Sequence, residues 1–114
     1  MGAKDDCYRL TQEIVVKRDV FCQRPGCDRD ASCGHHPFKR DKMGTAFMTE
    51  IIFGVCPQCH TGWAHGKPDE YKKFMIARVG RDVYYAARRR SNEVVKNLDY
   101  VQIRERLREE LAGL

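Results

Sequence analysis

The sequence predicts a small α+β domain that needs a stabilising crosslink in addition to its hydrophobic core. Three observations predict this class: apolar residues recur at helical spacing near both ends, a β-branched and aromatic run lies in the middle, and four cysteines form two close pairs that flank this run. Of the 114 residues, 42% are hydrophobic and 32% are charged. A chain of this size buries a modest part of its surface, so an additional staple is expected.

The first half of the chain is predicted to contain a helix, two strands and the start of another helix. Residues 5–18 carry an apolar stripe, and Cys7 lies on it, which favours a buried thiol that packs as a small hydrophobe. Residues 29–37 and 48–55 are predicted as strands, the second because of its β-branched and aromatic content. Residues 58–65 are predicted to begin the next helix.

The rest of the chain is predicted to be helical. Pro68 suits the first turn of a helix that Gly80 ends, and residues 82–95 are predicted to form the next helix. The chain therefore divides into a core with its N-terminal helix, residues 1–66, and a helical extension, residues 67–114.

The last helix is predicted to run from an N-cap at Asp99 to about residue 112, with Gln102 in the capping-box position. Arg106 and Glu110 are expected to pair across one turn. The sequence leaves open whether this helix packs on the core or on a second subunit in a homodimer.

Two cysteine knuckles predict a four-thiolate metal site. Cys22 and Cys27 enclose a Pro-Gly turn, and Cys56 and Cys59 enclose a CxxC turn. Each short turn lets both thiolates face one ion, and two turns complete the tetrahedron of a structural zinc. A redox CxxC is the alternative for the second pair, which the presence of the first pair disfavours. Cys33 remains an alternate ligand.

All four histidines fall in the segment that the knuckles organise. His35 and His36 follow the first knuckle, His60 directly follows the second, and His65 comes five residues later. Side chains that begin beside a rigid metal knuckle are held in place, so we expect a second, catalytic metal site here. The alternatives are additional zinc ligands or surface residues.

The charge balance favours a polyanionic partner. The net charge is +5, and four of these positive charges fall in residues 67–114. Nucleic acid suits such a chain, although a merely soluble basic protein is an equal alternative on charge alone. The candidates for contact with phosphate are Lys39, Arg40, Lys42, Arg88, Arg89 and Arg90. No group of residues predicts base reading, so weak sequence specificity is expected.

A membrane or classically secreted protein is disfavoured. The longest apolar run, residues 51–56, is far shorter than the roughly 18 residues that span a bilayer. The N-terminal segment carries Lys4, Asp5 and Asp6 where a signal peptide would be apolar. We therefore expect a cytoplasmic protein with no membrane partner.

The order of these motifs resembles the zinc-containing HNH endonucleases of the His-Me finger, or ββα-metal, superfamily. The resemblance covers residues 15–66 and rests on Arg18-Asp19-x-x-Cys22, the Pro-Gly turn up to Cys27, Ala31, the pair His35-His36, and Cys56-Pro-Gln-Cys59-His60. It implies a treble-clef-like ββα-metal finger stapled by the four-cysteine zinc. A looser similarity of the tail, at Pro68, Tyr71, Phe74, Gly80, Tyr84 and Asp99, to small phage-encoded HNH proteins linked to recombination implies a bacterial or phage-infected host cell.

Carried over residue by residue, the resemblance assigns a role to each histidine. His35 stands at a metal-ligand position, and His36 stands at the position of the general base. His60 stands at the later ligand position. His65 is the third ligand, although it lies five residues on where the usual spacing is four. Gly62 lies between the two, so the helix is expected to start late or to break.

One position departs from the family's pattern. The family's Asn, which pins the loop that carries the base, is replaced by Ile51, and no Asn lies between His36 and Cys56. Glu50 or Thr49 is expected to substitute for it; otherwise the site is slow or inactive. Three imidazoles favour Zn²⁺, Ni²⁺ or Mn²⁺, whereas a carboxylate from Glu50 would shift the preference toward Mg²⁺ or Mn²⁺.

Residues and resemblance together predict a metal-dependent DNA endonuclease or nickase. The catalytic candidates are His36, His35, His60 and Glu50. A divalent ion would neutralise charge on the phosphorane and stabilise the leaving oxygen, and neutral His36 would take the proton of the attacking water. The alternative is a non-catalytic zinc-finger module that binds nucleic acid, which the missing Asn favours.

Overall fold

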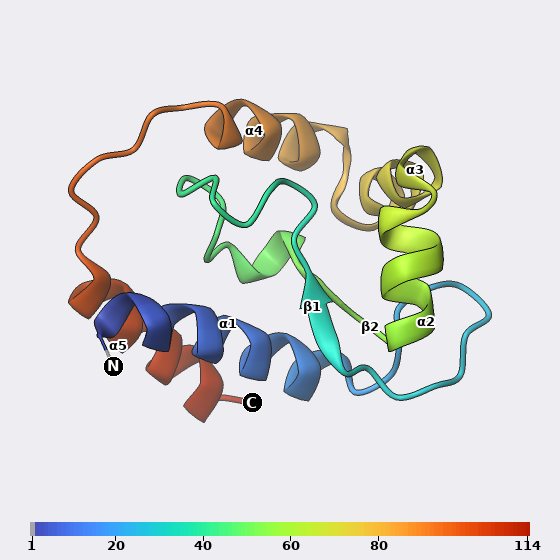
Figure 1. Ribbon diagram of the computed structural model, residues 1–114, viewed down its shortest axis with the longest axis horizontal. Coiled ribbons are helices and arrows are strands. Elements are labelled where there is room, and N and C mark those ends of the chain that lie inside the picture. The colour runs from blue at the N-terminus through green and yellow to red at the C-terminus, as the bar shows by residue number, and fades with distance from the viewer. Residues whose placement is uncertain (1) are drawn as a thin grey trace.

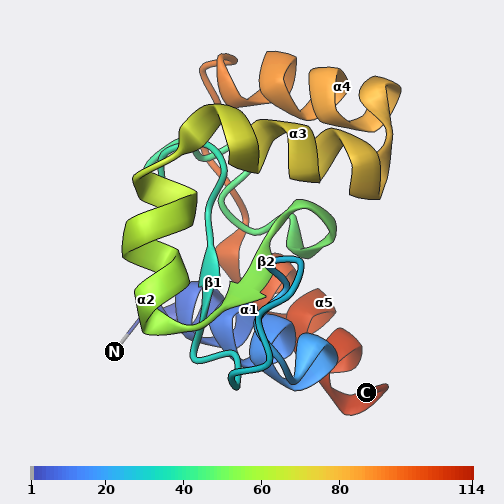
Figure 2. The same ribbon diagram turned by 90° about the vertical axis from the view of Figure 1, so that its right-hand side faces the viewer.

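The structure, a computed structural model, describes residues 2–114 and confirms the α+β class. Its elements are α1 (Ala3–Asp19), β1 (Cys33–His35), the 3₁₀ turn η1 (Thr49–Ile51), β2 (Phe53–Val55), α2 (Pro57–Cys59), the π-helix η2 (His60–His65), α3 (Pro68–Val79), α4 (Arg81–Ser91) and α5 (Tyr100–Ala112). The two strands lie between α1 and α5 on one side and α3 and α4 on the other (Figure 1, Figure 2). Among the described helices, none is long and apolar enough to cross a bilayer.

The two strands are shorter than the predicted spans 29–37 and 48–55. They pair in antiparallel register, with Cys33 opposite Val55, Gly34 opposite Gly54 and His35 opposite Phe53. Ahead of β2 the chain coils into η1, and both Ile51 and Ile52 are fully buried. A regular strand would point these neighbouring side chains to opposite faces, so the coil is what brings both into the core.

Helix α1 packs closely on β1 because Gly34 has no side chain. A Cβ added to Gly34 would lie 2.8 Å from Cγ2 of Ile52 and 3.1 Å from Cγ1 of Val15. The helix therefore rests almost directly on the strand that carries His35 and leads into His36. The predicted helix 5–18 is confirmed, slightly extended at both ends.

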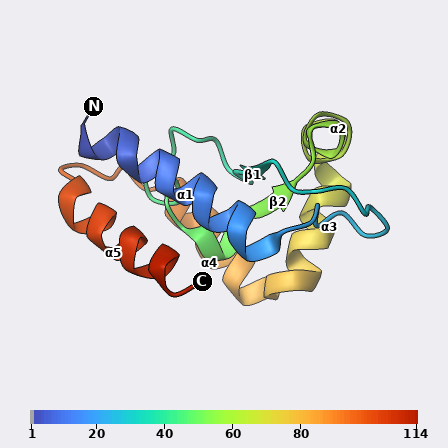
Figure 3. The same ribbon diagram turned by 90° about the horizontal axis from the view of Figure 1, so that it is seen from below.

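Helix α5 packs along α1, and Figure 3 shows the two helices side by side. Their shared core holds Cys7, Leu10, Ile14, Ala46, Phe47 and Leu107. Cys7 and Leu107 are both fully buried, which confirms the packing role predicted for the thiol. The sequence leaves the partner of this helix open, and within this chain the partner is α1.

The two ends of α5 differ from each other in how well they were predicted. Asp99 caps the helix as expected, because its carboxylate accepts a hydrogen bond from the Gln102 N–H at 3.0 Å. The predicted pair of Arg106 with Glu110 is wrong. Glu110 instead accepts a 2.6 Å hydrogen bond from the Thr49 hydroxyl, and Arg106 donates to the Phe47 carbonyl. Both side chains therefore tie α5 to the loop ahead of β2.

Helices α3 and α4 form a hairpin at the opposite end of the molecule (Figure 2). Pro68 occupies the first turn of α3, and Gly80, with φ of +91°, joins the two helices in a backbone conformation that suits glycine. Helix α4 ends at Ser91 rather than at the predicted residue 95. Its end is fixed by the Ser91 hydroxyl and the Asn92 amide, both of which donate to the Arg88 carbonyl.

Candidate metal centres

The first cysteine knuckle begins with a tight reversal of the chain at the end of α1. Val20 has φ of 65° and ψ of −56°, and the Phe21 N–H donates to the Asp19 carbonyl at 2.7 Å. These values describe a γ-turn of the strained kind, and a β-branched residue there costs roughly 1–3 kcal/mol. The turn points the chain from α1 directly into the Cys22 knuckle.

An ion pair at the end of α1 holds this reversal against β2. The Arg18 guanidinium pairs with Asp19 at 2.8 Å and donates to the carbonyls of Thr49 and Ile52 at 2.8 and 2.7 Å. The Asp19 carboxylate accepts a 2.7 Å hydrogen bond from the Gly54 N–H. The Arg-Asp pair before Cys22 is therefore structural: it fixes the first knuckle relative to the strand that leads into the second.

The four predicted thiols form one cluster. The Sγ atoms of Cys22, Cys27, Cys56 and Cys59 all lie within 4.8 Å of one another, and those of Cys27 and Cys56 are 3.9 Å apart. A tetrahedral zinc with Zn–S bonds of about 2.3 Å holds its sulfurs about 3.8 Å apart. Gly26, with φ of +84°, makes the turn that aligns the first pair. The cluster therefore fits a structural metal ion such as zinc.

Two arginines offset the negative charge that this cluster would carry. Burial opposes ionisation of Cys56, but the Cys59 N–H, 3.4 Å from its Sγ, and the Arg29 guanidinium bring the pKa of Cys56 down to about 6. An Arg24 nitrogen lies 4.0 Å from the Cys59 Sγ. One thiolate therefore forms readily at neutral pH, and a bound ion would displace the remaining protons.

A π-helix brings His60 and His65 onto one face. The helix that starts at α2 widens at η2, where each turn holds more residues than in an α-helix. Side chains five residues apart then align, and the Nε2 atoms of His60 and His65 are 3.1 Å apart. The expected late start or break at Gly62 is therefore wrong: the helix continues with a wider turn.

His35 completes a trio of imidazoles. Its ring lies edge-on to those of His65, His60 and Tyr71, with centroids 4.6, 5.3 and 4.7 Å away. Burial, with smaller contributions from the neighbouring histidines, lowers the pKa of His35 to about 3. Its buried Nδ1 has no hydrogen-bond partner among residues 2–114. The ring is therefore neutral at pH 7 and offers an unused lone pair.

The geometry of the trio fits a metal ion. One ring nitrogen from each of His35, His60 and His65 lies within 4.8 Å of the others. Nitrogens bound at about 2.0–2.1 Å to a tetrahedral ion would lie about 3.3 Å apart, close to the observed 3.1 Å. His35 is buried, His60 half-buried and His65 exposed, so the site opens to solvent on one side.

His36 lies beside the trio with a fixed tautomer. Its Nε2 is 2.9 Å from the Ala46 carbonyl, and because a carbonyl only accepts, Nε2 carries the proton. The lone pair is therefore on Nδ1. Burial lowers the pKa of His36 below its ordinary value, so the ring is neutral at pH 7. This is the state that a general base needs.

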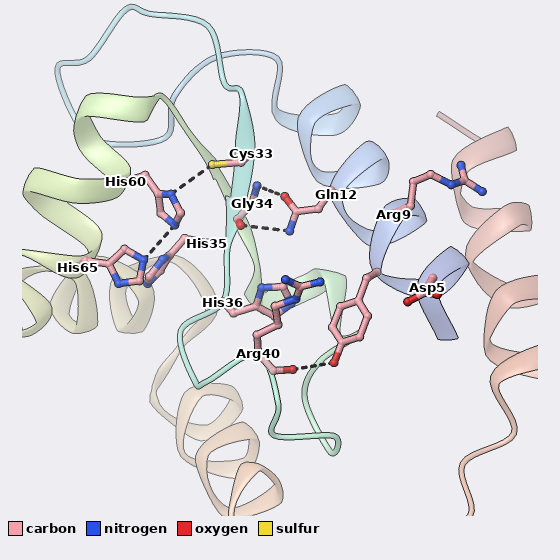
Figure 4. A pocket seen from close by; sticks show the side chains of 11 residues that line it. Asp5, Arg9, Gln12, Cys33, Gly34, His35, His36, Arg40, His60 and His65 are labelled. Atoms are coloured by element: carbon pink, nitrogen blue, oxygen red, sulfur yellow. Dashed lines mark hydrogen bonds between the residues drawn. The ribbon is translucent and has the colours of Figure 1, made fainter. Parts of the chain in front are cut away.

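The trio and His36 line one open pocket of about 630 Å³. Figure 4 shows the histidines on one side and α1 on the other. The residues that α1 contributes are Asp5, Tyr8, Arg9 and Gln12, which the sequence did not point to. They lie on the polar side of an amphipathic helix, more than 20 residues ahead of the histidines, and no local motif marks them.

Cys33 lies at the edge of the same pocket. Its Sγ is 3.5 Å from Nδ1 of His60, the ring nitrogen opposite the one near His65. Burial raises the pKa of the Cys33 thiol, which disfavours a reactive thiolate. Cys33 is thus a neighbour of a candidate ligand, and it stands apart from the four-thiol cluster for which the sequence made it an alternate.

Glu50 and Thr49 lie away from the histidines. Glu50 is exposed and lines a different pocket, together with Arg90 and Arg106. Thr49 is buried, and its hydroxyl donates to Glu110. Both residues belong to η1, which turns the chain before it reaches β2. Among the described residues, neither side chain therefore hydrogen-bonds to the loop that carries His36, where the missing Asn was expected to be replaced.

The predicted basic residues fall into two groups. Arg40 lines the histidine pocket with its guanidinium 4.4 Å from the centre of the Tyr8 ring, and Lys39 and Lys42 lie nearby in sequence. The second group, Arg88, Arg89 and Arg90, ends α4. Within residues 2–114 none of these six forms an ion pair. Arg90 differs from its neighbours because its Nε donates to the Gly44 carbonyl at 2.7 Å.

Comparisons of the chain with protein-family models, with curated proteins and with solved structures give no match. The two clusters themselves are therefore the basis for inferring a function. One offers four thiols within 4.8 Å of one another, and the other offers three imidazoles that line an open pocket, beside a fourth imidazole with a free lone pair.

Proposed function

We propose that this chain is a metal-dependent DNA endonuclease or nickase of the HNH type, built on a treble-clef-like ββα-metal finger. In this proposal β1, β2 and the helix α2–η2 form the finger, and a zinc ion held by the four cysteines staples it. The observation that carries the proposal is the meeting of His35, His60 and His65 beside a neutral His36 in one open pocket.

The residues divide the chemistry of phosphodiester hydrolysis between them. His35, His60 and His65 would hold a divalent ion, which supplies Lewis-acid stabilisation of the phosphorane and of the leaving oxygen when bound. His36 would take the proton of the attacking water at Nδ1, because its Nε2 already donates to the Ala46 carbonyl. Arg40, at the wall of the same pocket, would orient a phosphate.

The donor set narrows the choice of ion. With Glu50 in another pocket, the ligands that converge are three imidazoles, which favour Zn²⁺, Ni²⁺ or Mn²⁺ over Mg²⁺. The net charge of +5 and the arginines at the end of α4 support binding through the phosphate backbone with little sequence preference. The similarity of the tail to phage HNH proteins favours a role in DNA processing or recombination inside a bacterial or infected cell.

A non-catalytic zinc finger that binds nucleic acid is the second candidate. The absence of an Asn near His36 favours it, and neither Glu50 nor Thr49 takes that place. The histidine trio is open to solvent on one side, which disfavours the non-catalytic candidate, because a purely structural site does not need an open side.

Nicking of a supercoiled plasmid separates the two candidates. The purified protein would be assayed with Mg²⁺, Mn²⁺, Ni²⁺ and Zn²⁺, each at matched free concentration, beside a His36→Ala variant purified in the same way. The proposal expects nicking by the wild type with at least one of the last three ions and none by the variant. Equal nicking by both would indicate a contaminating nuclease. Folded, metal-loaded protein that binds DNA but never cleaves it would favour the non-catalytic module.

A further inference from the structure

Two side chains of α1 hydrogen-bond to the backbone of the two strands. Gly34 and Gly54 lie opposite each other in the register. The Gln12 carboxamide accepts from the Gly34 N–H at 2.6 Å and donates to the Gly34 carbonyl at 3.3 Å. On the other strand, Asp19 accepts from the Gly54 N–H at 2.7 Å. Gln12 thus pairs with both polar groups of Gly34, much as a third strand would (Figure 4).

The reach of Gln12 depends on how closely α1 packs. A side chain at Gly34 would collide with Val15 and Ile52, so only glycine allows the helix to lie at this distance from β1. At this distance the carboxamide of a glutamine meets the strand backbone. An asparagine is one methylene shorter and would fall short of it.

The two hydrogen bonds from Gln12 act on Gly34, the residue that directly precedes the two histidines. When both the N–H and the carbonyl of Gly34 are held, the peptide planes from which His35 and His36 begin are held as well. The His35 imidazole lies beside that of His65, and the His36 ring reaches the Ala46 carbonyl instead. A change in the backbone at Gly34 would therefore displace both the ligand and the base.

We propose that Gln12 is a positioning residue, which fixes the His35–His36 segment and fills the role left open by the missing Asn. The inference rests on the proposed function and deepens it by assigning this role to a side chain on a separate helix. Gln12 lines the pocket without contacting any of the four imidazoles through a hydrogen bond, so it acts through the backbone rather than on the reacting atoms.

The direct test replaces Gln12→Met, which keeps the length of the side chain and removes both hydrogen bonds. The matched control is Gln102→Met, an exposed glutamine on α5. We expect Gln12→Met to lower kcat about 100-fold, because small misplacements of catalytic groups cost this much, while KM for DNA changes less than about twofold. The measurements are made well below the Tm of the variant, at a temperature where circular dichroism shows it folded.

A second readout does not depend on cleavage. His35 begins at the peptide that Gln12 holds, so the Ni²⁺ affinity of zinc-loaded protein, measured by calorimetry, should fall in Gln12→Met. We expect a loss of about tenfold, the low end of the range for a direct outer partner of a metal ligand, and no change in Gln102→Met. A wild type that binds Ni²⁺ without cleaving DNA would overturn the proposed function and still test the role of Gln12. Unchanged Ni²⁺ affinity and unchanged kcat in Gln12→Met would overturn the positioning role.

If Gln12→Met does not fold, Gln12→Glu provides the same test in a milder form. A carboxylate still accepts from the Gly34 N–H but cannot donate to its carbonyl. We expect a smaller loss of kcat and of Ni²⁺ affinity than complete removal would give, with KM unchanged. Values equal to the wild type in both measurements would overturn the inference.

Discussion

The cysteine cluster and the histidine cluster share one stretch of chain but differ in how open they are to solvent. Cys59 and His60 are neighbours in sequence, yet Cys59 points into a site whose ligands are buried, apart from a half-buried Cys27. His60 points into a pocket of about 630 Å³ that opens past the exposed His65. A closed four-ligand site holds a fold together, whereas a three-ligand site leaves coordination positions for water or substrate.

The two clusters are built from neighbouring turns of the chain. The four thiols come from two rigid turns, and Arg18 with Asp19 locks these turns to each other through β2. His60 directly follows the second turn, and His35 is the last residue of β1. The four cysteines and the larger hydrophobic core, which includes Trp63 and Tyr71, together hold the elements from which the imidazoles meet.

The largest effect is expected when the closed site is broken. Cys59→Ser should release the zinc and unfold the domain, because structural zinc contributes roughly 10 kcal/mol or more of apparent binding energy near pH 7. Zinc content and the circular dichroism spectrum report this directly. The matched control is Cys33→Ser, whose thiol lies outside the four-thiol cluster. A folded, zinc-free Cys59→Ser protein would contradict the structural role.

If the proposed function holds, loss of His36 should leave both clusters intact and slow cleavage strongly. His36→Ala is expected to lower kcat by about 10²–10⁴-fold, the range typical of general bases, without changing zinc content or DNA affinity. Plasmid nicking under single-turnover conditions measures the rate. An unchanged rate in variant protein freed of contaminating nuclease would show that another group takes the proton, and the tautomer fixed by Ala46 would then play no part in catalysis.

Loss of an open-site ligand should give an intermediate effect. His60→Ala removes one of three imidazoles, so Ni²⁺ affinity should fall by at least the ~10–100-fold that even an outer partner contributes. One zinc per chain should remain, because Cys59 and its cluster are untouched, and excess Ni²⁺ should partly restore cleavage. If the variant instead loses its zinc and unfolds, the two clusters form one structural unit and the contrast between them is wrong.

The sequence predicts the cysteine cluster more completely than the histidine cluster, for physical reasons. Each thiol pair is set by a local turn, so spacing alone is informative. The position of His65 depends on η2, and a π-helical turn leaves no mark in the pattern of residues. Gln12 was missed because its contact depends on the distance between α1 and β1, which Gly34 determines in three dimensions.

Gln12 was missed by the sequence analysis, whereas Glu50 was wrongly included in the candidate site. Its carboxylate and its place beside Ile51, which replaces the family's Asn, made it a candidate to hold the loop or to help at the metal, and the β-branched run around it predicted a long strand. The core instead buries both Ile51 and Ile52, so the chain coils into η1 and Glu50 lines a separate pocket with Arg90 and Arg106. Local preference for a strand was overridden by burial of two adjacent side chains.

The smallest expected effect is on the salt dependence of DNA binding. It tests whether the basic residues near the open site or those on α4 contact the duplex. Arg90 donates to the Gly44 carbonyl, so its substitution would disturb the fold as well as the charge. Arg88 and Arg89 are exposed and form no ion pair within residues 2–114, which disfavours a merely structural pairing with acids.

The double variant Arg88→Ala with Arg89→Ala is therefore cleaner than a triple one. Each phosphate that such a variant leaves without its cation should reduce the steepness of the log-log salt dependence of duplex binding by about 0.9, equally on two unrelated sequences. The matched variant Lys39→Ala with Lys42→Ala tests the loop that follows His36. If only the lysine variant changes the slope, DNA contacts the pocket side and α4 lies outside the interface. If only the arginine variant does, the duplex extends from the histidines across α4, past the cavity that Arg88 and His35 both line.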